Sequence, residues 1–318
     1  MGGRRSRGSG TFVKLYVGIT DNDWFRFLSN RTDIDEVNFW QPSGSRAFRA
    51  LQPGEPFLFK LHSPADFIVG GGFLARYSPL PVELAWEAFR EKNGVGSPEE
   101  MRLRIARYRR VGVDPRESFT IGCIVLVEPF FFDRNLWIPI PADFPKHVQQ
   151  GKSYDTTSGT GRAIWAAVEE RLQADARFVI VERDAPMWGS PALVHRRLGQ
   201  GSFRVLVTET YERRCAITQE KALPVLQAAH IRPVTKFGQH RIDNGILLRS
   251  DVHTLFDQGY ITVTPDHRVR VSQRLKRDFD NGEHYYQLDR SQLWLPGRSE
   301  DQPKREFLEW HANTVFRG

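Results

Sequence analysis

The stretch from Arg214 to Ile261 limits most strongly what the chain can fold into, because apolar runs and turn residues follow one another there in a definite order. LPVLQAAHI is typical of a short apolar strand that ends at His230, and a basic loop follows it. An Asn-Gly turn at Asn244 precedes a second strand, ILL, and a helix is expected to begin at Ser250. This order predicts a strand, a loop, a strand and a helix, with His230 on the first strand and His253 in the helix.

These residue types suit hydrolysis of a phosphodiester. A neutral imidazole such as that of His230 can take a proton from water near pH 7. A divalent metal can stabilise the charge that develops on phosphorus and on the departing oxygen. His253 and Asp257 lie one turn apart on the expected helix, so both side chains project from one face and could hold a single ion. Asn244 is expected to fix the base or the loop through its amide.

The same stretch resembles the HNH family of endonucleases, and within it the branch found in modification-dependent restriction enzymes. The segments that carry the resemblance are AAHIRP around His230, NGILLRSDVHTLFD from Asn244 to Asp257, and GYITV from Gly259. The resemblance implies a ββα-metal fold and endonuclease activity. It implies His230 as the general base, His253 as a metal ligand, and Asn244 as the third position of the catalytic set.

The stretch departs from the HNH pattern at two places. Many HNH enzymes have an acidic metal ligand immediately before the base, where this chain has Ala229. The carboxylate must then come from Asp257, or from Asp251 at the helix start. Many members also carry paired CxxC knuckles, but Cys215 is followed by Thr218, so no structural zinc is expected. One divalent ion is expected at each site, Mg²⁺ or Mn²⁺ first, with Co²⁺ or Ni²⁺ as alternatives.

A separate module is expected over residues 11–184. EVNFW, PFLFKLH, FIVGGGFL and FTIGCIVLVEPFFF are typical of strands, and PVELAWEAFREKNG and SPEEMRLRIARYRRVG of amphipathic helices. GKSYDTTSGTGR is expected to be a polar loop, and the Gly70–Gly72 run a β-bulge or a place of close backbone packing. Short strands with inserted helices favour a small curled β-barrel over a doubly wound sheet, and the whole chain is expected to be α+β.

Residues 11–184 resemble the PUA superfamily, whose EVE, ASCH, YTH and SRA-like members include readers of modified bases. LYVGITDNDWFRFL, NFWQPSG, GEPFLFKLH and IVGGGF carry this likeness. It implies capture of a base that has rotated out of the duplex into an aromatic-lined pocket. The residues expected to offer stacking faces and hydrogen bonds there are Trp24, Asn38, Phe39, Trp40, Gln41 and Ser43. Trp24 and Phe39 also suit an ordinary barrel core.

The charge of the chain favours a polyanionic partner. Its 45 basic and 38 acidic residues give a net charge of +7 and a pI near 9.5. We expect a disordered basic tail over residues 1–10, a linker over 185–201 and the nuclease domain over 202–318. The residues expected on the DNA backbone are Arg196, Arg197, Arg204, Arg232, Lys236 and Arg249.

The two cysteines predict no disulfide framework, and the sequence shows neither a signal-peptide core nor an apolar run of membrane-spanning length. We therefore expect a protein of the bacterial cytoplasm that has no membrane partner.

Together the two halves predict a type IV-like restriction endonuclease with a defence role. The first half would flip and read a modified base in double-stranded DNA, a modified cytosine such as 5-methylcytosine first, and the second would cut nearby. Because one HNH site cuts one strand, a homodimer is expected. Three alternatives stay open: an HNH DNase without modification dependence, a reader that does not cut, and an enzyme directed at RNA.

Overall fold

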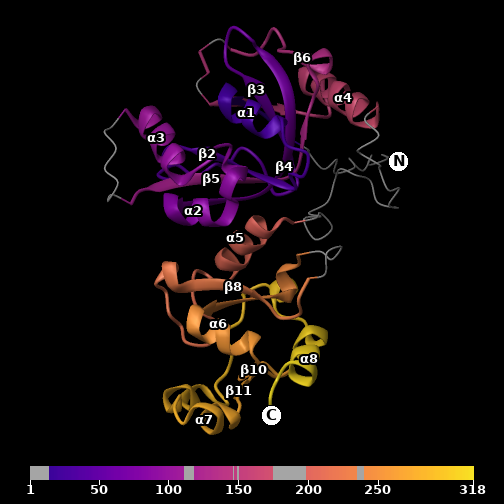
Figure 1. Cartoon of the computed structure of the whole chain (residues 1–318). Coiled ribbons are helices and arrows are strands. Elements are labelled where there is room, and N and C mark those ends of the chain that lie inside the picture. The colour runs from indigo at the N-terminus through magenta and orange to yellow at the C-terminus, as the bar shows by residue number, and fades with distance from the viewer. Residues whose placement is uncertain (1–13, 111–117, 146, 149, 175–197, 235–239) are drawn as a thin grey trace, which may run out of the picture. The chain divides into compact units, whose positions relative to one another are not determined.

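The computed structural model describes residues 14–110, 118–145, 147–148, 150–174, 198–234 and 240–318 (Figure 1). The chain divides into two compact units, Met1–Arg196 and Arg197–Gly318, and each is described by itself. The expected tail and most of the expected linker lie outside the described residues. A large sheet and several helices confirm the mixed α+β class. No helix in the described ranges combines the length and apolar character that a bilayer crossing needs.

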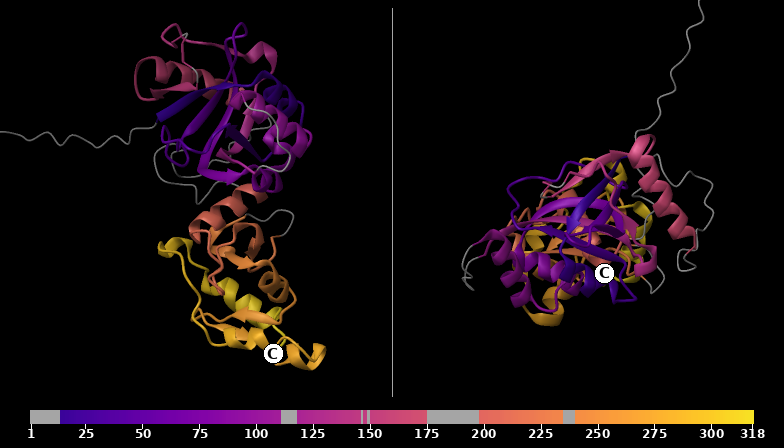
Figure 2. Two further views of the ribbon diagram at one scale, coloured as in Figure 1. Left: turned by 90° about the vertical axis from the view of Figure 1, so that its left-hand side faces the viewer. Right: turned by 90° about the horizontal axis from the view of Figure 1, so that it is seen from above.

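A seven-stranded sheet forms the centre of the first unit, with strand order β2-β5-β4-β3-β1-β7 and β6 beside β4 (Figure 2). Only the β1–β3 pair among these strands is parallel. The strands are β1 (Lys14–Thr20), β2 (Glu36–Gln41), β3 (Pro56–Leu61), β4 (Phe67–Pro81), β5 (Thr120–Phe131), β6 (Ile138–Pro139) and β7 (Gly151–Asp155). Within the described residues no pairing joins β2 to β7, so the expected closed barrel is not observed.

The glycine run in β4 lets the long strand bend and approach its neighbours closely. The pairing of β4 with β5 shifts register between Gly71 and Phe73. A Cβ on Gly71 would lie 2.7 Å from the Phe57 carbonyl oxygen and 2.7 Å from the Phe130 ring. Both the expected bulge and the expected close packing are therefore confirmed, and they allow one strand to pair with β3, β5 and β6.

The first unit also contains helices, two of which have a side-chain cap at the N-terminus. The helices are α1 (Asn22–Ser29), α2 (Val82–Phe89), α3 (Pro98–Arg109) and α4 (Gly159–Ala174), with short 3-10 turns η1 (Arg90–Asn93) and η2 (Arg134–Leu136). Asp21 caps α1 by accepting from the backbone N–H groups of Asp23 and Trp24, and Ser97 caps α3, as expected. The prediction of a polar loop was wrong at Gly151–Asp155, because this segment forms β7 and pairs with the edge of β1.

Among its described residues, the second unit contains two antiparallel pairs of strands and four α-helices. In chain order its elements are α5 (Gln200–Thr210), η4 (Leu223–Val225), β8 (Leu226–His230), η5 (Ile242–Asn244), β9 (Gly245–Arg249), α6 (Ser250–Asp257), β10 (Ile261–Val263), β11 (Val269–Val271), α7 (Arg274–Phe279), η6 (Glu283–Leu288), η7 (Ser299–Asp301) and α8 (Arg305–Thr314). The strand that ends at His230, the second strand and the helix start at Ser250 are confirmed. Helix α5 begins after Gly199, and Ser202 is buried inside it.

The core of the second unit decides which face of α6 is exposed. Val252 and Phe256 lie one turn apart and are fully buried against β9 and α8. His253 and Asp257 each follow one of these residues, and one residue turns the helix by about 100°. The buried pair therefore turns His253 and Asp257 away from the core, and His253 contacts Gln227 of β8.

Candidate active site

His230 is the last residue of β8, and its ring has a stacking contact on one face and a hydrogen bond at its edge. The ring stacks on Phe203 of α5, with centroids 3.9 Å apart and planes inclined by 7°. Its Nε2 lies 2.9 Å from Nδ1 of His240. Burial, and then the nearby His240 and His253, lower the pKa of His230 to about 4. The ring is therefore neutral at pH 7, which a proton acceptor requires.

Asn244 fastens the chain immediately after His230. Its Oδ1 accepts from the Arg232 backbone N–H at 2.9 Å, and its Nδ2 donates to the Arg232 carbonyl at 2.8 Å. Its own carbonyl accepts from the Ile231 N–H at 3.0 Å. The amide thus fixes the exit of β8, which is the kind of contact expected of Asn244.

The glycine after Asn244 has a packing role and is not part of a hairpin turn. Asn244 ends the 3-10 turn η5, and Gly245 has an extended backbone with φ −116°. A Cβ on Gly245 would lie 2.6 Å from Val207 Cγ2 and 3.0 Å from the Phe203 ring. The expected Asn-Gly hairpin turn was therefore wrong. The glycine instead lets β9 approach α5 closely, and Phe203 of α5 stacks on the ring of His230.

His253 and Asp257 form an open pair on the exposed face of α6. His253 Nδ1 lies 2.7 Å from Gln227 Oε1, and an amide oxygen can only accept, so Nδ1 carries the proton. Nε2 then keeps its lone pair and lies 3.3 Å from Asp257 Oδ2. Burial lowers the pKa of His253, although Asp257 opposes this shift. The Asp257 side chain is 58% exposed and the His253 side chain 21%, so solvent reaches the pair mainly at the carboxylate.

The His253–Asp257 pair fits a divalent ion. It offers one imidazole nitrogen, freed by the hydrogen bond of the other nitrogen to Gln227, and one carboxylate oxygen. No group of three or more His, Cys, Asp or Glu side chains in the described part of the chain is arranged to hold a metal. An ion held by two side chains keeps its remaining positions for water and substrate phosphate. The donor set therefore suits a metal that the substrate helps to bind.

Asp251 is already engaged by other side chains. Arg249 donates to both of its oxygens, at 2.7 and 2.8 Å, and the Tyr285 hydroxyl donates at 3.0 Å. The Arg249 hydrogen bonds lower the pKa of Asp251 to about 2, against the opposing effect of burial. This geometry favours Asp257 over Asp251 as the carboxylate ligand. It also leaves the Arg249 guanidinium paired within the protein, although it was expected on the DNA backbone.

The other residues expected to contact the DNA backbone are spread over several parts of the chain. Arg204 on α5 lies close enough to His253 to lower its pKa by charge repulsion. Arg232 is exposed just after β8, with its guanidinium 5.7 Å from the Trp310 ring centre. Arg196, Arg197 and Lys236 lie outside the described residues.

The residues expected to form a base pocket lie on two faces of β2. Phe39 packs with Trp24 and Phe57, at ring centroid distances of 5.5 and 4.6 Å, in an aromatic core. Asn38 and Trp40, one residue to either side, face the opposite way. Both bond to Asn93: Asn38 Nδ2 donates to its Oδ1 at 2.8 Å, and Trp40 Nε1 donates to its carbonyl at 3.0 Å.

The remaining two expected pocket residues flank the end of β2. Gln41 is half-buried at the last position of the strand, and Ser43 bonds to Ser45 at 2.8 Å in the loop that follows. The structure therefore does not gather the six residues around one hollow.

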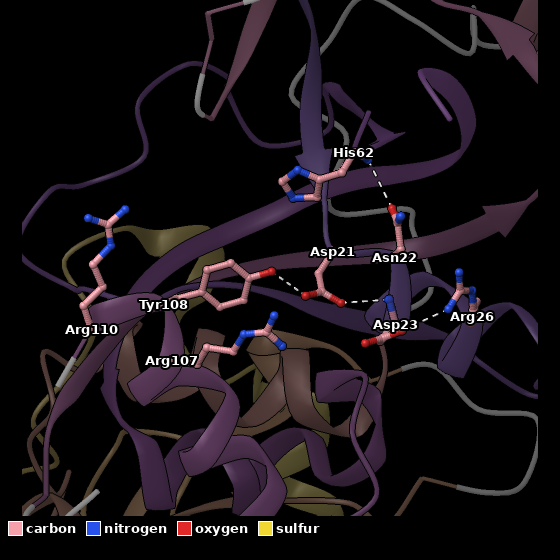
Figure 3. A pocket seen from close by; sticks show the side chains of 8 residues that line it. All are labelled: Asp21, Asn22, Asp23, Arg26, His62, Arg107, Tyr108 and Arg110. Carbon is pink, nitrogen blue, oxygen red and sulfur yellow. Dashed lines mark hydrogen bonds and ion pairs between the residues drawn. The ribbon is translucent and has the colours of Figure 1, made fainter. Parts of the chain in front are cut away.

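A different hollow of about 530 Å³ lies beside the start of α1 (Figure 3). Its lining residues are Asp21, Asn22, Asp23, Arg26, His62, Arg107, Tyr108 and Arg110. The Tyr108 hydroxyl donates to Asp21, the residue that caps α1. None of the six expected pocket residues lines this hollow.

Sequence reasoning missed three residues of the nuclease site: Phe203, Gln227 and His240. Each acts through a contact between segments that meet only when the chain folds: Phe203 of α5 contacts His230, Gln227 of β8 contacts His253 of α6, and His240 contacts His230 across a loop. A second histidine shortly before Asn244 was the one available signal for His240.

Comparison with known proteins indicates the class to which the second unit belongs. Residues 215–264 match a family model described as HNH endonuclease. The matched residues include His230, Asn244, His253 and Asp257. The second unit thus carries an HNH endonuclease domain, and the protein is a nuclease that hydrolyses phosphodiester bonds.

Two solved structures show a distant likeness. A mutant ZmASCH protein from Zymomonas mobilis is 8% identical, with coverage of 49% of this chain and 95% of that one and a TM-score of 0.30. A modification-dependent TagI restriction endonuclease is 14% identical, with coverage of 90% and 77% and a TM-score of 0.25. No curated protein sequence matches the chain. With TM-scores this low, the PUA-like fold of the first unit stays a prediction.

Proposed function

We propose that this nuclease is a modification-dependent restriction endonuclease acting on double-stranded DNA. In this proposal the first unit takes a modified base out of the duplex, a modified cytosine first of all, and the HNH domain cuts nearby. The observation that carries the cutting half is the position of His230, which stacks on Phe203 and lies close enough to His253 of the His253–Asp257 pair for that residue to help lower its pKa. The reading half rests on the resemblance of residues 11–184 to the PUA superfamily and on the net charge of +7.

The proposed cutting step uses the residues in distinct roles. His230 takes a proton from the water that attacks phosphorus, and Asn244 keeps the backbone after His230 in place. His253 and Asp257 would hold one divalent ion, which when bound supplies positive charge for the phosphate and the departing oxygen. Arg204 and Arg232 would contact neighbouring phosphates and make binding dependent on salt.

In the first unit two buried polar atoms, Asn38 Oδ1 and Trp24 Nε1, have no hydrogen-bond partner among the described residues. Asn38 bonds to Asn93, whereas Trp24 packs with Phe39 on the other face of β2, so the two atoms do not line one hollow. The reading step is therefore proposed from the resemblance and the charge of the chain.

Cleavage of a matched set of plasmids tests this proposal. The set is unmodified, cytosine-methylated, hydroxymethylated and adenine-methylated DNA, each with Mg²⁺ or Mn²⁺ and with His230→Ala as the control. Cutting confined to one modified plasmid, and lost in His230→Ala, is the expected result. Equal cutting of all plasmids would contradict the reading half and favour an HNH DNase without modification dependence. Tight binding with no cutting would favour a reader that does not cut.

The proposal also requires two HNH sites for a double-strand break, since one site cuts one strand. We therefore propose that two copies of the chain act together. Nicked plasmid accumulating without linear product at every protein concentration would contradict this part alone.

A further inference from the structure

A second histidine lies in hydrogen-bond contact with the proposed base. His240 Nδ1 is 2.9 Å from His230 Nε2, with ring centroids 5.0 Å apart and planes inclined by 45°. The backbone holds His240 on both sides. It forms a β-bridge with Leu198, and the next residue, Arg241, accepts from the Asn244 N–H at 3.2 Å. The contact thus joins two ends of one loop that the fold has brought together.

The two contacts of His230 constrain its ring in different ways. Stacking on Phe203 at 3.9 Å fixes the plane of the ring. A rotation of the ring by half a turn keeps that plane and exchanges the positions of its nitrogen and carbon atoms, so stacking does not select between the two states. The His240 contact reaches one nitrogen only and therefore selects one of them.

The hydrogen bond also decides where the proton of His230 resides. A bond between two imidazole nitrogens needs a proton on one and a lone pair on the other. If His240 donated, the Nε2 lone pair of His230 would be occupied and its Nδ1 would carry the proton, which leaves no basic atom. If His240 accepts, His230 carries its proton on Nε2, and Nδ1 is free to take a proton from water. A base at position 230 therefore requires His240 as the acceptor.

We propose that His240 is a positioning residue that holds His230 in the Nε2–H tautomer. When Nδ1 of His230 has taken the proton of the attacking water, His240 Nδ1 continues to accept the hydrogen bond from the resulting imidazolium. The inference rests on the proposed role of His230 as base and adds a residue to that site. His240 itself exchanges no proton with water or DNA.

Three variants test the kinetic consequence. His240→Leu keeps a bulky side chain and removes the acceptor, whereas His240→Asn retains an oxygen that can accept. His267→Asn is the matched control, because His267 lies in the β10–β11 turn at φ 60°, a conformation that asparagine tolerates. We expect kcat to fall about 10–100-fold in His240→Leu with little change in KM. We expect partial recovery in His240→Asn and no change in His267→Asn. Cleavage by His240→Leu at the unaltered rate would overturn the proposal.

A spectroscopic measurement on the free full-length protein separates this inference from the proposed function. Nitrogen-15 shifts of labelled histidine distinguish the two neutral tautomers of His230. We expect the Nε2–H tautomer in the unaltered protein and a mixture in His240→Leu. A dominant Nδ1–H tautomer in the unaltered protein would overturn the role of His240, even if the enzyme cuts DNA. If neither the unaltered protein nor His240→Leu cuts any DNA, the proposed function fails. The tautomer of His230 still shows which of the two histidines accepts the hydrogen bond.

Discussion

Asn244 and Arg232 are joined by two hydrogen bonds that run in opposite directions between one side-chain amide and one backbone unit, at 2.9 and 2.8 Å. The amide accepts from the N–H through its oxygen and donates to the carbonyl through its nitrogen, so one side chain satisfies both backbone groups. This contact explains why asparagine is suited to this position. It keeps the residues that follow His230 in register with η5.

Asn244→Asp should therefore destabilise the protein, although it changes only the donor half of the amide. The carboxylate would face the Arg232 carbonyl without a proton to donate, in a buried position. We expect the free energy of unfolding to fall by about 1–3 kcal/mol, measured by urea denaturation at pH 7. Cleavage should fall as well, because the exit of β8 would no longer be fixed. Equal stability of the two proteins would show that this contact contributes little.

Asp257→Asn should weaken metal binding, and Asp251→Asn provides the matched control. Asp257 is open to solvent beside His253 Nε2, whereas Asp251 is bound by Arg249 and Tyr285. We expect the Mn²⁺ affinity, measured by titration calorimetry, to fall about 10–100-fold in Asp257→Asn and to change little in Asp251→Asn. The reverse result would make Asp251 the carboxylate ligand.

Stability should fall as the pH falls from about 6.5 to about 4, and His311 should account for part of that fall. Burial lowers the pKa of His311 to about 4, although its hydrogen bond to the Phe256 carbonyl opposes the shift. Between the unfolded and folded pKa values the unfolded chain binds more protons, so acid favours unfolding. The full shift corresponds to about 3 kcal/mol. His311→Gln does not titrate, so its free energy of unfolding should depend less on pH over this range. An unchanged pH dependence would contradict this account.

Gly245→Ala should destabilise the second unit, whereas Gly297→Ala should not. A Cβ at position 245 would lie 2.6 Å from Val207, but nothing lies within 4 Å of one at position 297. We expect a loss of about 1–3 kcal/mol in the free energy of unfolding for the first variant, because the strand must move away from α5. For the second we expect a change within about 0.5 kcal/mol. Similar values for both would show that β9 can shift at little cost.

The nuclease site could be predicted from the sequence where its geometry is local. The strand to His230, the start of α6 at Ser250 and the shared face of His253 and Asp257 all follow from short-range patterns. The partners of these residues could not be predicted, since His240, Gln227 and Phe203 reach the site through the packing of separate segments. The pairing of Asp251 with Tyr285 is likewise a contact between distant parts of the chain.

The first unit was less predictable because its arrangement depends on strand pairing. The polar segment Gly151–Asp155 has no alternating apolar pattern that would predict a strand. It forms one because its backbone pairs with the edge of β1. A barrel closes only when the two end strands of the sheet, here β2 and β7, pair with each other, and no local sequence pattern predicts that pairing. The pocket prediction placed Phe39 and Trp40 together. Successive side chains of a strand point to opposite faces, so these two residues lie on opposite faces of β2.

We propose His230 as the general base of the nuclease, acting together with the His253–Asp257 pair. The most direct measurement is the initial rate of nicking of a supercoiled plasmid with modified cytosines, in Mn²⁺, by the unaltered protein and by His230→Ala, with His267→Asn as control. We predict that His230→Ala nicks at least about 100-fold more slowly while it binds the plasmid with unchanged affinity. Nicking by His230→Ala at the rate of the control would contradict the account.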